Sequence, residues 1–240
     1  MPTSDPKPER DLDARQRRAD ELEALSTYLL RSVEQERSEL AKQLHDELGG
    51  LITAAKMDMA WLTARIGKTL DAESTEKFNS VVQMLNQAMT LKRQVVESLR
   101  PSLLDHFGLA VAMRSHFDEQ CRGAGIECVA SLPEETPDLD ATAQLTLFRV
   151  AQEVLGGILG RHGVKNVEVV MEEEEGGYSM VIGDDGAPMD TDLARLMPSA
   201  RHRVALSGGR IEAESRAGEG GAAGGNQVRV FVPRSAAGSA

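Results

Sequence analysis

A histidine followed directly by an aspartate, His45 and Asp46, lies in a stretch rich in helix-forming residues. A neutral imidazole is nucleophilic, and its usual pKa of about 6.5 leaves most of it neutral near pH 7. A nearby carboxylate can orient one ring nitrogen or accept its proton. Successive helical residues point about 100° apart, so Asp46 is expected to reach the ring only obliquely. The pair is a candidate for nucleophilic chemistry, with His45 as the attacking group.

Most histidines in helices are ordinary surface or core residues. His45 differs from them because the carboxylate of Asp46 follows it directly in the sequence. The remaining histidines lack such a context and are assigned no chemical role: His106, His116, His162 and His202.

The residues around His45 predict one long helix. From Leu12 to Arg65 the chain contains no proline and is dense in helix-forming residues. Apolar or small residues recur along it at steps of three or four, with a weak place around Glu36: Leu22, Ser26, Leu29, Val33, Leu40, Leu44, Leu48, Leu51, Ala55, Met59 and Leu62. At 1.5 Å per residue the helix would be on the order of 80 Å long, so a partner helix is expected.

A second apolar stripe follows the polar stretch 71–75 and is closed by Pro101, since proline stops a helix. Its members are Phe78, Val81, Leu85, Ala88, Lys92, Val95 and Leu99. Two helices joined by a short turn form an antiparallel hairpin whose apolar seam stays half covered, and two copies would complete a four-helix bundle. A homodimer is therefore expected, although a plain structural coiled coil explains the periodicity equally well.

From residue 102 the pattern changes to alternating helices and strands. Helices are predicted near 105–122, 139–162 and 190–206, and strands near 126–132, 166–174, 178–183, 209–215 and 226–232. The whole chain is therefore expected to be α+β, a helical hairpin followed by an α/β sandwich. The expected organisation is a disordered tail (1–11), the hairpin (12–101), the α/β domain (102–234) and a second tail (235–240). The glycine-rich stretch 218–226 is expected to be a flexible connection.

Composition restricts the partners and the compartment. The 240 residues carry a formal net charge of −11, with a pI near 5.0, which opposes binding to nucleic acid or anionic membrane and favours a protein partner. No run approaches the roughly 18 apolar residues of a membrane span, and the polar start does not resemble a signal peptide. A cytoplasmic location is expected. Cys121 and Cys128 are too few for a disulfide framework and are expected to be reduced thiols.

The segment ERSELAKQLHDELGGL (36–51) resembles the phosphoacceptor box of a sensor histidine kinase subfamily, whose response regulators have helix-turn-helix output domains. The matching positions are Glu36, Arg37, Leu40, Ala41, Leu44, His45, Asp46, Leu48, Gly49 and Leu51. LRPSLLDHFGL (99–109) resembles the family's interdomain link, and LFRVAQEVL (147–155) resembles the start of its ATP-site helix. The resemblance covers nearly everything after about residue 30. It implies a dimerisation hairpin, a GHKL-like ATPase domain, His45 as the phosphoacceptor and Asp46 as its proton partner.

The resemblance weakens where the nucleotide would bind. Glu153 matches the family, but the asparagine that helps hold magnesium four residues later is Gly157 here. Asp184 and Gly186 match the adenine-reading aspartate and its glycine turn, whereas Pro188 replaces the second turn glycine and removes an N–H donor.

Two further departures affect the phosphates. The glycine pair that precedes the phosphate-facing helix falls on LMPSA (196–200), which contains no glycine, and the segment 186–200 is short for a nucleotide lid. The segment from Gly218 to Gly221, in contrast, resembles the last glycine-rich motif of the family's nucleotide site. Polyphosphate binding depends on magnesium, backbone N–H donors and a helix N-terminus, so a degenerate ATP site is expected.

The sequence therefore predicts a histidine phosphotransfer protein or pseudokinase, in which His45 exchanges phosphoryl groups with a response-regulator receiver domain. No metal site of its own is expected, and Mg²⁺ would be supplied with the response regulator. Gly50 stands where family members that dephosphorylate their regulators commonly have a glutamine. Two alternatives remain: an active sensor kinase, which alone would use ATP, and a non-catalytic dimeric module that sequesters a regulator.

Overall fold

The computed structural model describes residues 7–134, 138–216 and 225–234. They form two compact units, which divide between Pro101 and Ser102. The expected tail residues 1–6 and 235–240, and residues 217–224 with the glycine box, lie outside the described residues. Among the described helices, none is both long and apolar enough to cross a membrane.

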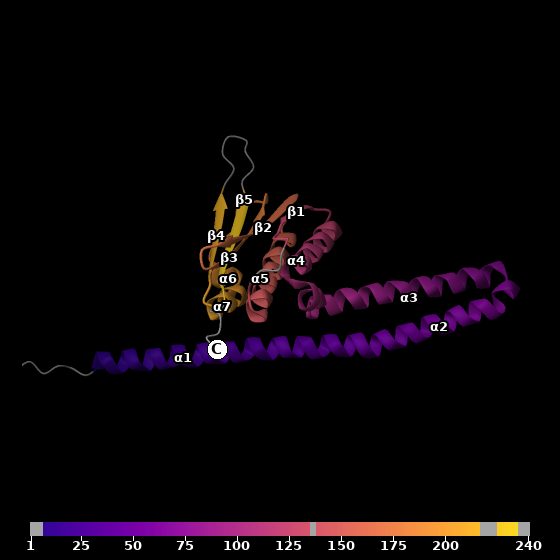
Figure 1. Cartoon of the computed structure of the whole chain (residues 1–240), viewed down its shortest axis with the longest axis horizontal. Coiled ribbons are helices and arrows are strands. Elements are labelled where there is room, and N and C mark those ends of the chain that lie inside the picture. Colours follow the sequence, from indigo (N-terminus) through magenta and orange to yellow (C-terminus); the bar gives the residue numbers. More distant parts are fainter. Residues whose placement is uncertain (1–6, 135–137, 217–224, 235–240) are drawn as a thin grey trace, which may run out of the picture. The chain divides into compact units, whose positions relative to one another are not determined.

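The N-terminal unit is a helical hairpin (Figure 1). Its first arm runs without interruption through α1 (Lys7–Gln43), the π-helical segment η1 (Leu44–Leu48) and α2 (Gly49–Ile66). The short 3₁₀ turn η2 (Gly67–Thr69) leads into the second arm, α3 (Ala72–Leu99).

The two arms of the hairpin begin at defined residues, and the start of the first corrects the sequence prediction. The first helix begins at Lys7, so residues 7–11 are helical and do not belong to a disordered tail. The second arm starts directly after Asp71, because the Asp71 side chain caps α3 by accepting a hydrogen bond from the Ser74 N–H at 2.8 Å. Hydrogen bonds from the Ser74 hydroxyl and N–H hold the pKa of the Asp71 carboxyl below its ordinary value.

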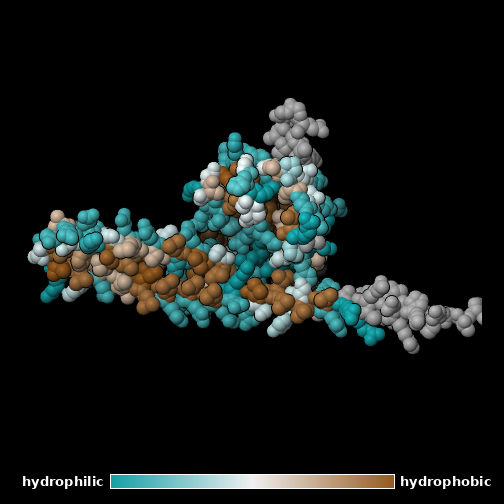
Figure 2. All heavy atoms as spheres, turned by 180° about the vertical axis from the view of Figure 1, so that it is seen from behind, coloured by the Kyte–Doolittle hydropathy of each residue, from teal (hydrophilic) through white to brown (hydrophobic). Residues whose placement is uncertain are grey.

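Large apolar side chains stay exposed along the hairpin, and Figure 2 shows them as a hydrophobic band. On the first arm they include Leu22, Leu25, Leu29, Val33, Leu40, Leu48, Leu51, Met57 and Trp61. On α3 they include Met84, Leu91 and Val95. Contact between the two arms therefore leaves much of the apolar surface of the unit uncovered.

The C-terminal unit is a two-layer α/β domain, so the chain as a whole is α+β, as predicted. Its helices are α4 (Ser102–Ala124), α5 (Ala141–Leu159), α6 (Leu193–Leu196) and α7 (Pro198–Leu206). Its strands are β1 (Glu127–Ser131), β2 (Asn166–Glu174), β3 (Gly177–Asp184), β4 (Arg210–Arg216) and β5 (Gly225–Pro233). The strand order is β1-β2-β3-β5-β4; β1 and β2 are parallel and the other neighbours are antiparallel.

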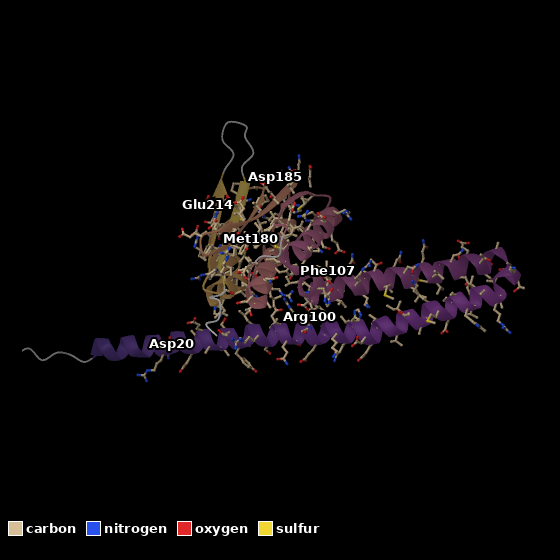
Figure 3. All side chains as sticks on the ribbon, viewed as in Figure 1. Asp20, Arg100, Phe107, Met180, Asp185 and Glu214 are labelled. Atoms are coloured by element: carbon tan, nitrogen blue, oxygen red, sulfur yellow. The ribbon has the colours of Figure 1, made fainter. Side chains whose placement is uncertain are left out.

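One face of this sheet packs against the helices and forms the core. Strand residues alternate between buried and more exposed positions, as a sheet with one covered face requires. Met180 of β3 is completely buried in this core and is labelled in Figure 3. The largest fully buried side chains from the helices are Leu109, Met113, Phe117, Leu147, Phe148 and Leu155.

Two predicted helices are interrupted. Gly108 adopts a φ of 79° inside α4, a conformation that favours glycine, and the helix is kinked there. The stretch 190–206 contains two short helices instead of one, because Pro198 occupies the first turn of α7, a position that proline favours.

Candidate functional site

His45 and Asp46 lie in the π-helical segment η1, and both side chains are exposed. A π-helical turn holds one residue more than an α-helical turn. The partly or fully buried positions here are Ala41, Leu44, Gly49 and Ile52, so their spacing widens to five between Leu44 and Gly49. The additional residue allows Leu44 and Gly49 both to lie on the buried side, while residues 45–47 between them face outward.

The structure does not bring His45 and Asp46 into direct contact. Among the described residues, no hydrogen bond or ion pair joins their side chains. This agrees with the oblique placement expected for successive helical residues. The imidazole is therefore accessible to a second protein, with a carboxylate next to it on the same surface.

The two glycines after η1 have different surroundings. A Cβ atom on Gly49 would lie 2.9 Å from Nζ of Lys92, so Gly49 lets α3 approach the first arm closely. A Cβ atom on Gly50 would have no neighbour within 4 Å. Gly50 is also exposed, so a Cβ atom at position 50 would meet no obstacle.

The residues expected at the nucleotide site gather in the C-terminal unit. A cavity of about 120 Å³ is lined by Glu153, Gly157 and Asp184, together with apolar side chains. Gly186 lies directly against Asp184, since its N–H donates to Asp184 Oδ1 at 2.9 Å. The structure thus brings together the three predicted nucleotide-site residues, Glu153, Asp184 and Gly186.

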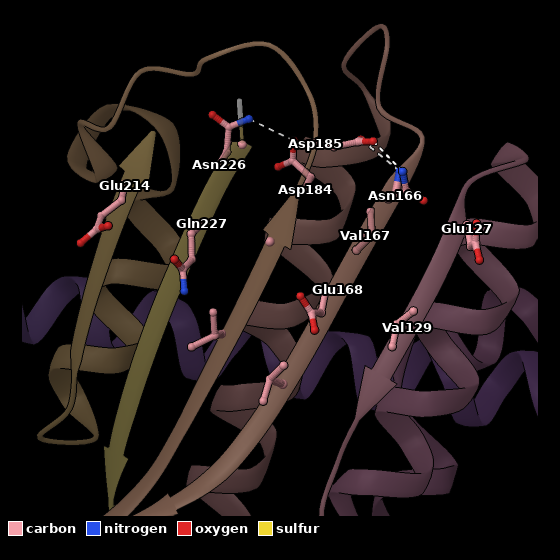
Figure 4. Close-up of a pocket in the computed structure, with 14 residues that line it drawn as sticks. Glu127, Val129, Asn166, Val167, Glu168, Asp184, Asp185, Glu214, Asn226 and Gln227 are labelled. Atoms are coloured by element: carbon pink, nitrogen blue, oxygen red, sulfur yellow. Dashed lines mark hydrogen bonds between the residues drawn. The ribbon is translucent and has the colours of Figure 1, made fainter. Parts of the chain in front are cut away.

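The Asp184 side chain is 3% exposed and accepts three hydrogen bonds. Its Oδ1 accepts from Gly186 and from Asn226 Nδ2 at 3.0 Å (Figure 4), and its Oδ2 accepts from Arg161 Nη2. Arg161 and Asn226 were not among the predicted site residues, since both lie outside the motifs on which the family resemblance was based.

Asn226 also holds the turn that follows Asp184. Its Nδ2 donates to the carbonyl oxygen of Ala187 at 3.0 Å, and its Oδ1 accepts from the Met189 N–H at 3.0 Å and from the Ser215 hydroxyl at 2.8 Å. Asn226 is 3% exposed, and these partners satisfy its amide, as a buried amide normally requires.

Glu153 lies close to the first turn of α7. Burial raises the pKa of its carboxyl, and the charge of Arg203 and hydrogen bonds from the Ala200 backbone and the Ser199 side chain oppose this only in part. A carboxylate therefore accepts hydrogen bonds at the helix N-terminus that the family resemblance assigns to phosphates.

A larger hollow of about 660 Å³ lies across the sheet face that the helices do not cover (Figure 4). Its lining includes Val129, Val170 and Val181, and the carboxylates of Glu127 and Glu168. The smaller cavity is the better candidate site, since buried polar side chains converge there. Among the residues that the structure describes, no group of three or more His, Cys, Asp or Glu side chains is arranged to hold a metal ion.

Comparison with known proteins relates the chain to one family. Residues 36–104 match a family described as histidine kinase. The chain is 30% identical over 172 residues to the sensor histidine kinase MctS of Rhizobium johnstonii, covering 70% of this chain and 36% of that protein. It is 28% identical over 192 residues to the signal transduction histidine-protein kinase/phosphatase UhpB of Salmonella typhimurium, covering 78% of this chain and 38% of that protein. The chain thus spans less than two fifths of the length of these two curated relatives.

Solved structures with similarity to the chain include two histidine kinases. One is the Acinetobacter baumannii histidine kinase AdeS, with a TM-score of 0.42 and 13% identity over 76% of this chain and 95% of that chain. The other is the catalytic domain of histidine kinase ThkA, with a TM-score of 0.42 and 16% identity over 52% of this chain and 90% of that chain.

Proposed function

Because the chain belongs to the sensor histidine kinases of two-component systems, we propose that it is a histidine phosphotransfer protein or pseudokinase. In this proposal His45 exchanges phosphoryl groups with aspartates of response-regulator receiver domains, within a phosphorelay. The C-terminal unit serves as a docking or structural module.

The proposal is supported by the contrast between His45, which is accessible, and the cavity around Glu153 and Asp184, which is small. His45 is exposed within the segment that matches the histidine kinase family. The cavity around Glu153 and Asp184 has a volume of about 120 Å³, whereas sites for ligands of drug size usually span roughly 300–1,000 Å³. The position four residues after Glu153 is Gly157, whose missing side chain cannot coordinate magnesium.

The exposed position of His45 suits direct transfer from an aspartyl phosphate. The unprotonated ring nitrogen attacks phosphorus, a P–N bond forms, and the P–O bond to the regulator's aspartate breaks. The other ring nitrogen then loses its proton, and the Asp46 carboxylate is the proposed acceptor. Mg²⁺ is proposed to arrive with the receiver domain, where it would neutralise charge on the transferring group.

We further propose that the functional form is a homodimer. Leu22, Leu51 and Met57 are 66%, 69% and 68% exposed in a single chain, and each would contribute about 1.5–3 kcal/mol if fully buried. A second hairpin could cover this surface and form a four-helix bundle.

An active ATP-dependent kinase is the second candidate, and the kinase names of the matched relatives favour it. A sequestering module is the third. Calorimetry with Mg-ATP distinguishes the phosphotransfer protein from the active kinase, since we expect no binding at micromolar concentration.

Titration of a phosphorylated receiver domain distinguishes the phosphotransfer protein from the sequestering module. We expect its phosphate to move to wild-type protein but not to the His45→Ala variant, whereas equal biological activity of both proteins would favour sequestration.

A further inference from the structure

The cavity around Asp184 has the chemistry of a site for a planar ring that bears an amino group. Its apolar wall is formed by Val154, Ile158, Ile182, Met189, Leu196, Met197 and Val228. The Asp184 carboxylate is a buried acceptor at this cavity, and an amino group on an aromatic ring is a suitable donor. Adenine combines such an amino group with an apolar ring face.

In this chain Arg161 takes the place of that donor. The residue follows the C-terminal end of α5, where its N–H donates to the Ile158 carbonyl oxygen at 3.0 Å. Its side chain lines the cavity, and Nη2 contacts Oδ2 of Asp184. Gly186 and Asn226 donate to Oδ1, whereas Arg161 donates to Oδ2, the other oxygen of the carboxylate.

The arginine is held inside the protein and does not extend freely into water. Its side chain is 26% exposed, and Nη1 is buried without a hydrogen-bond partner among the described residues. An unsatisfied buried donor is unfavourable, so the bond to Asp184 must hold the guanidinium in place. A guanidinium remains charged at physiological pH, and a charge-assisted bond to a carboxylate is stronger than one from a neutral amine.

We propose that Arg161 is the residue that excludes adenine nucleosides from this cavity, by occupying Asp184 Oδ2. The inference rests on the proposed function, in which the cavity is a former nucleotide site. It concerns the nucleoside alone, so it does not depend on the phosphate or magnesium positions. Removal of Arg161 should therefore restore adenosine binding even though Gly157 and Pro188 remain unchanged.

The test is calorimetric titration of the full chain with adenosine, without magnesium. We expect Arg161→Ala to bind adenosine at least tenfold more tightly than wild type. Inosine should show no such gain, because it presents a carbonyl oxygen to the carboxylate where adenosine presents an amino group. Arg229→Ala is the matched control, since it removes an exposed arginine whose ion pair with Glu174, at 3.4 Å, lies on the strands away from Asp184. The control should bind adenosine as weakly as wild type.

Two further measurements keep the outcome clear. Arg161→Ala leaves a buried carboxylate without its cation and could unfold the domain, so Arg161→Gln is examined in parallel, because its neutral amide should be displaced by adenosine. A folded variant that binds adenosine no better than wild type, or wild-type binding as tight as that of the variants, overturns the inference. Phosphate exchange at His45 is measured in the same proteins and should not change. Intact exchange without a gain in adenosine binding contradicts this inference alone, whereas a gain in binding without any exchange contradicts only the proposed function.

Discussion

The environment of Glu153 predicts how stability depends on pH. Burial raises the pKa of this carboxyl above its ordinary value of 4.5, so the folded state binds more protons than the unfolded state in the pH range just above 4.5. The contribution of Glu153 to the free energy of unfolding therefore falls as the pH rises through that range. Glu153→Gln removes the ionisation and keeps an acceptor for the bonds from Ser199 and Ala200.

We predict that Glu153→Gln raises the free energy of unfolding at pH 7.5 and leaves it nearly unchanged at pH 4. Urea denaturation at the two pH values measures the difference. Glu168→Gln, on an exposed glutamate of β2, is the control and should have little effect at either pH. A larger stabilisation by Glu153→Gln at pH 4 than at pH 7.5 would contradict the predicted direction of the pH dependence.

Asp46 should matter for the rate of transfer and not for the fold. Its side chain is exposed, and Asp46→Asn keeps the size while removing the proton acceptor. Loss of a general base typically slows a reaction by about 10²-fold or more. Rapid-mixing measurements of phosphate loss from a receiver domain, with circular dichroism as a check on folding, test this. An unchanged rate would exclude Asp46 as the proton partner.

Gly50 predicts slow hydrolysis of regulator phosphate. Glycine cannot orient a water molecule, whereas a glutamine amide can, and positioning is a large part of phosphoryl-transfer catalysis. The open space around Gly50 means that Gly50→Gln fits, and it should also stabilise the helix by up to about 1 kcal/mol. Release of inorganic phosphate should be slow with wild type and faster with the variant. Rapid release by the His45→Ala protein would defeat this idea.

The candidate site was only partly predictable at the level of residues. Glu153, Asp184 and Gly186 match a family pattern, and the structure places them together. Arg161 and Asn226 could not be assigned, because their roles depend on contacts between positions 23 and 42 residues apart in the sequence.

At the level of elements, the π-helical segment is the main feature that sequence periodicity did not reveal. Apolar steps of three and four fit a continuous α-helix through His45, and composition does not distinguish a five-residue step. The widened spacing from Leu44 to Gly49 becomes visible only through burial. π-helical turns occur frequently at functional sites, which agrees with the position of His45.

We predict that deleting Glu47 converts η1 into regular α-helix and impairs phosphotransfer. The deletion removes the additional residue, which turns His45 relative to α3, and misplacement of a reacting group by about 1 Å can reduce a rate by about 10²-fold. Glu47→Ala keeps the length and serves as the control. Helical content by circular dichroism should stay the same in both. Full transfer activity after the deletion would mean that the π turn has no functional role.

For the whole molecule, the α+β class followed from the change in periodicity near Pro101, and all five predicted strands are present. The interruptions at Gly108 and Met197 were harder to predict, because a helical pattern of apolar residues continues across each of them. The exposed apolar surface of the hairpin agrees with the periodicity, which required a partner helix.

The homodimer can be tested on that surface. Leu51 is 69% exposed in one chain, so Leu51→Asp should leave the hairpin folded while placing an unpaired charge in the proposed interface, at a cost of several kcal/mol. Light scattering at micromolar concentration should give a dimer for wild type and a monomer for the variant. Lys68→Asp, in the turn η2, is the control and should remain dimeric. A monomeric wild type would contradict the proposal.

In the proposed function, His45 receives its phosphoryl group from a response regulator and not from ATP. Equal samples of the protein are incubated with a receiver domain carrying labelled aspartyl phosphate and with Mg-ATP labelled at the γ-phosphate. We expect acid-labile label on wild type from the receiver domain, none on His45→Ala, and negligible label from ATP. Rapid labelling of His45 by Mg-ATP, or no labelling by the receiver domain, would contradict it.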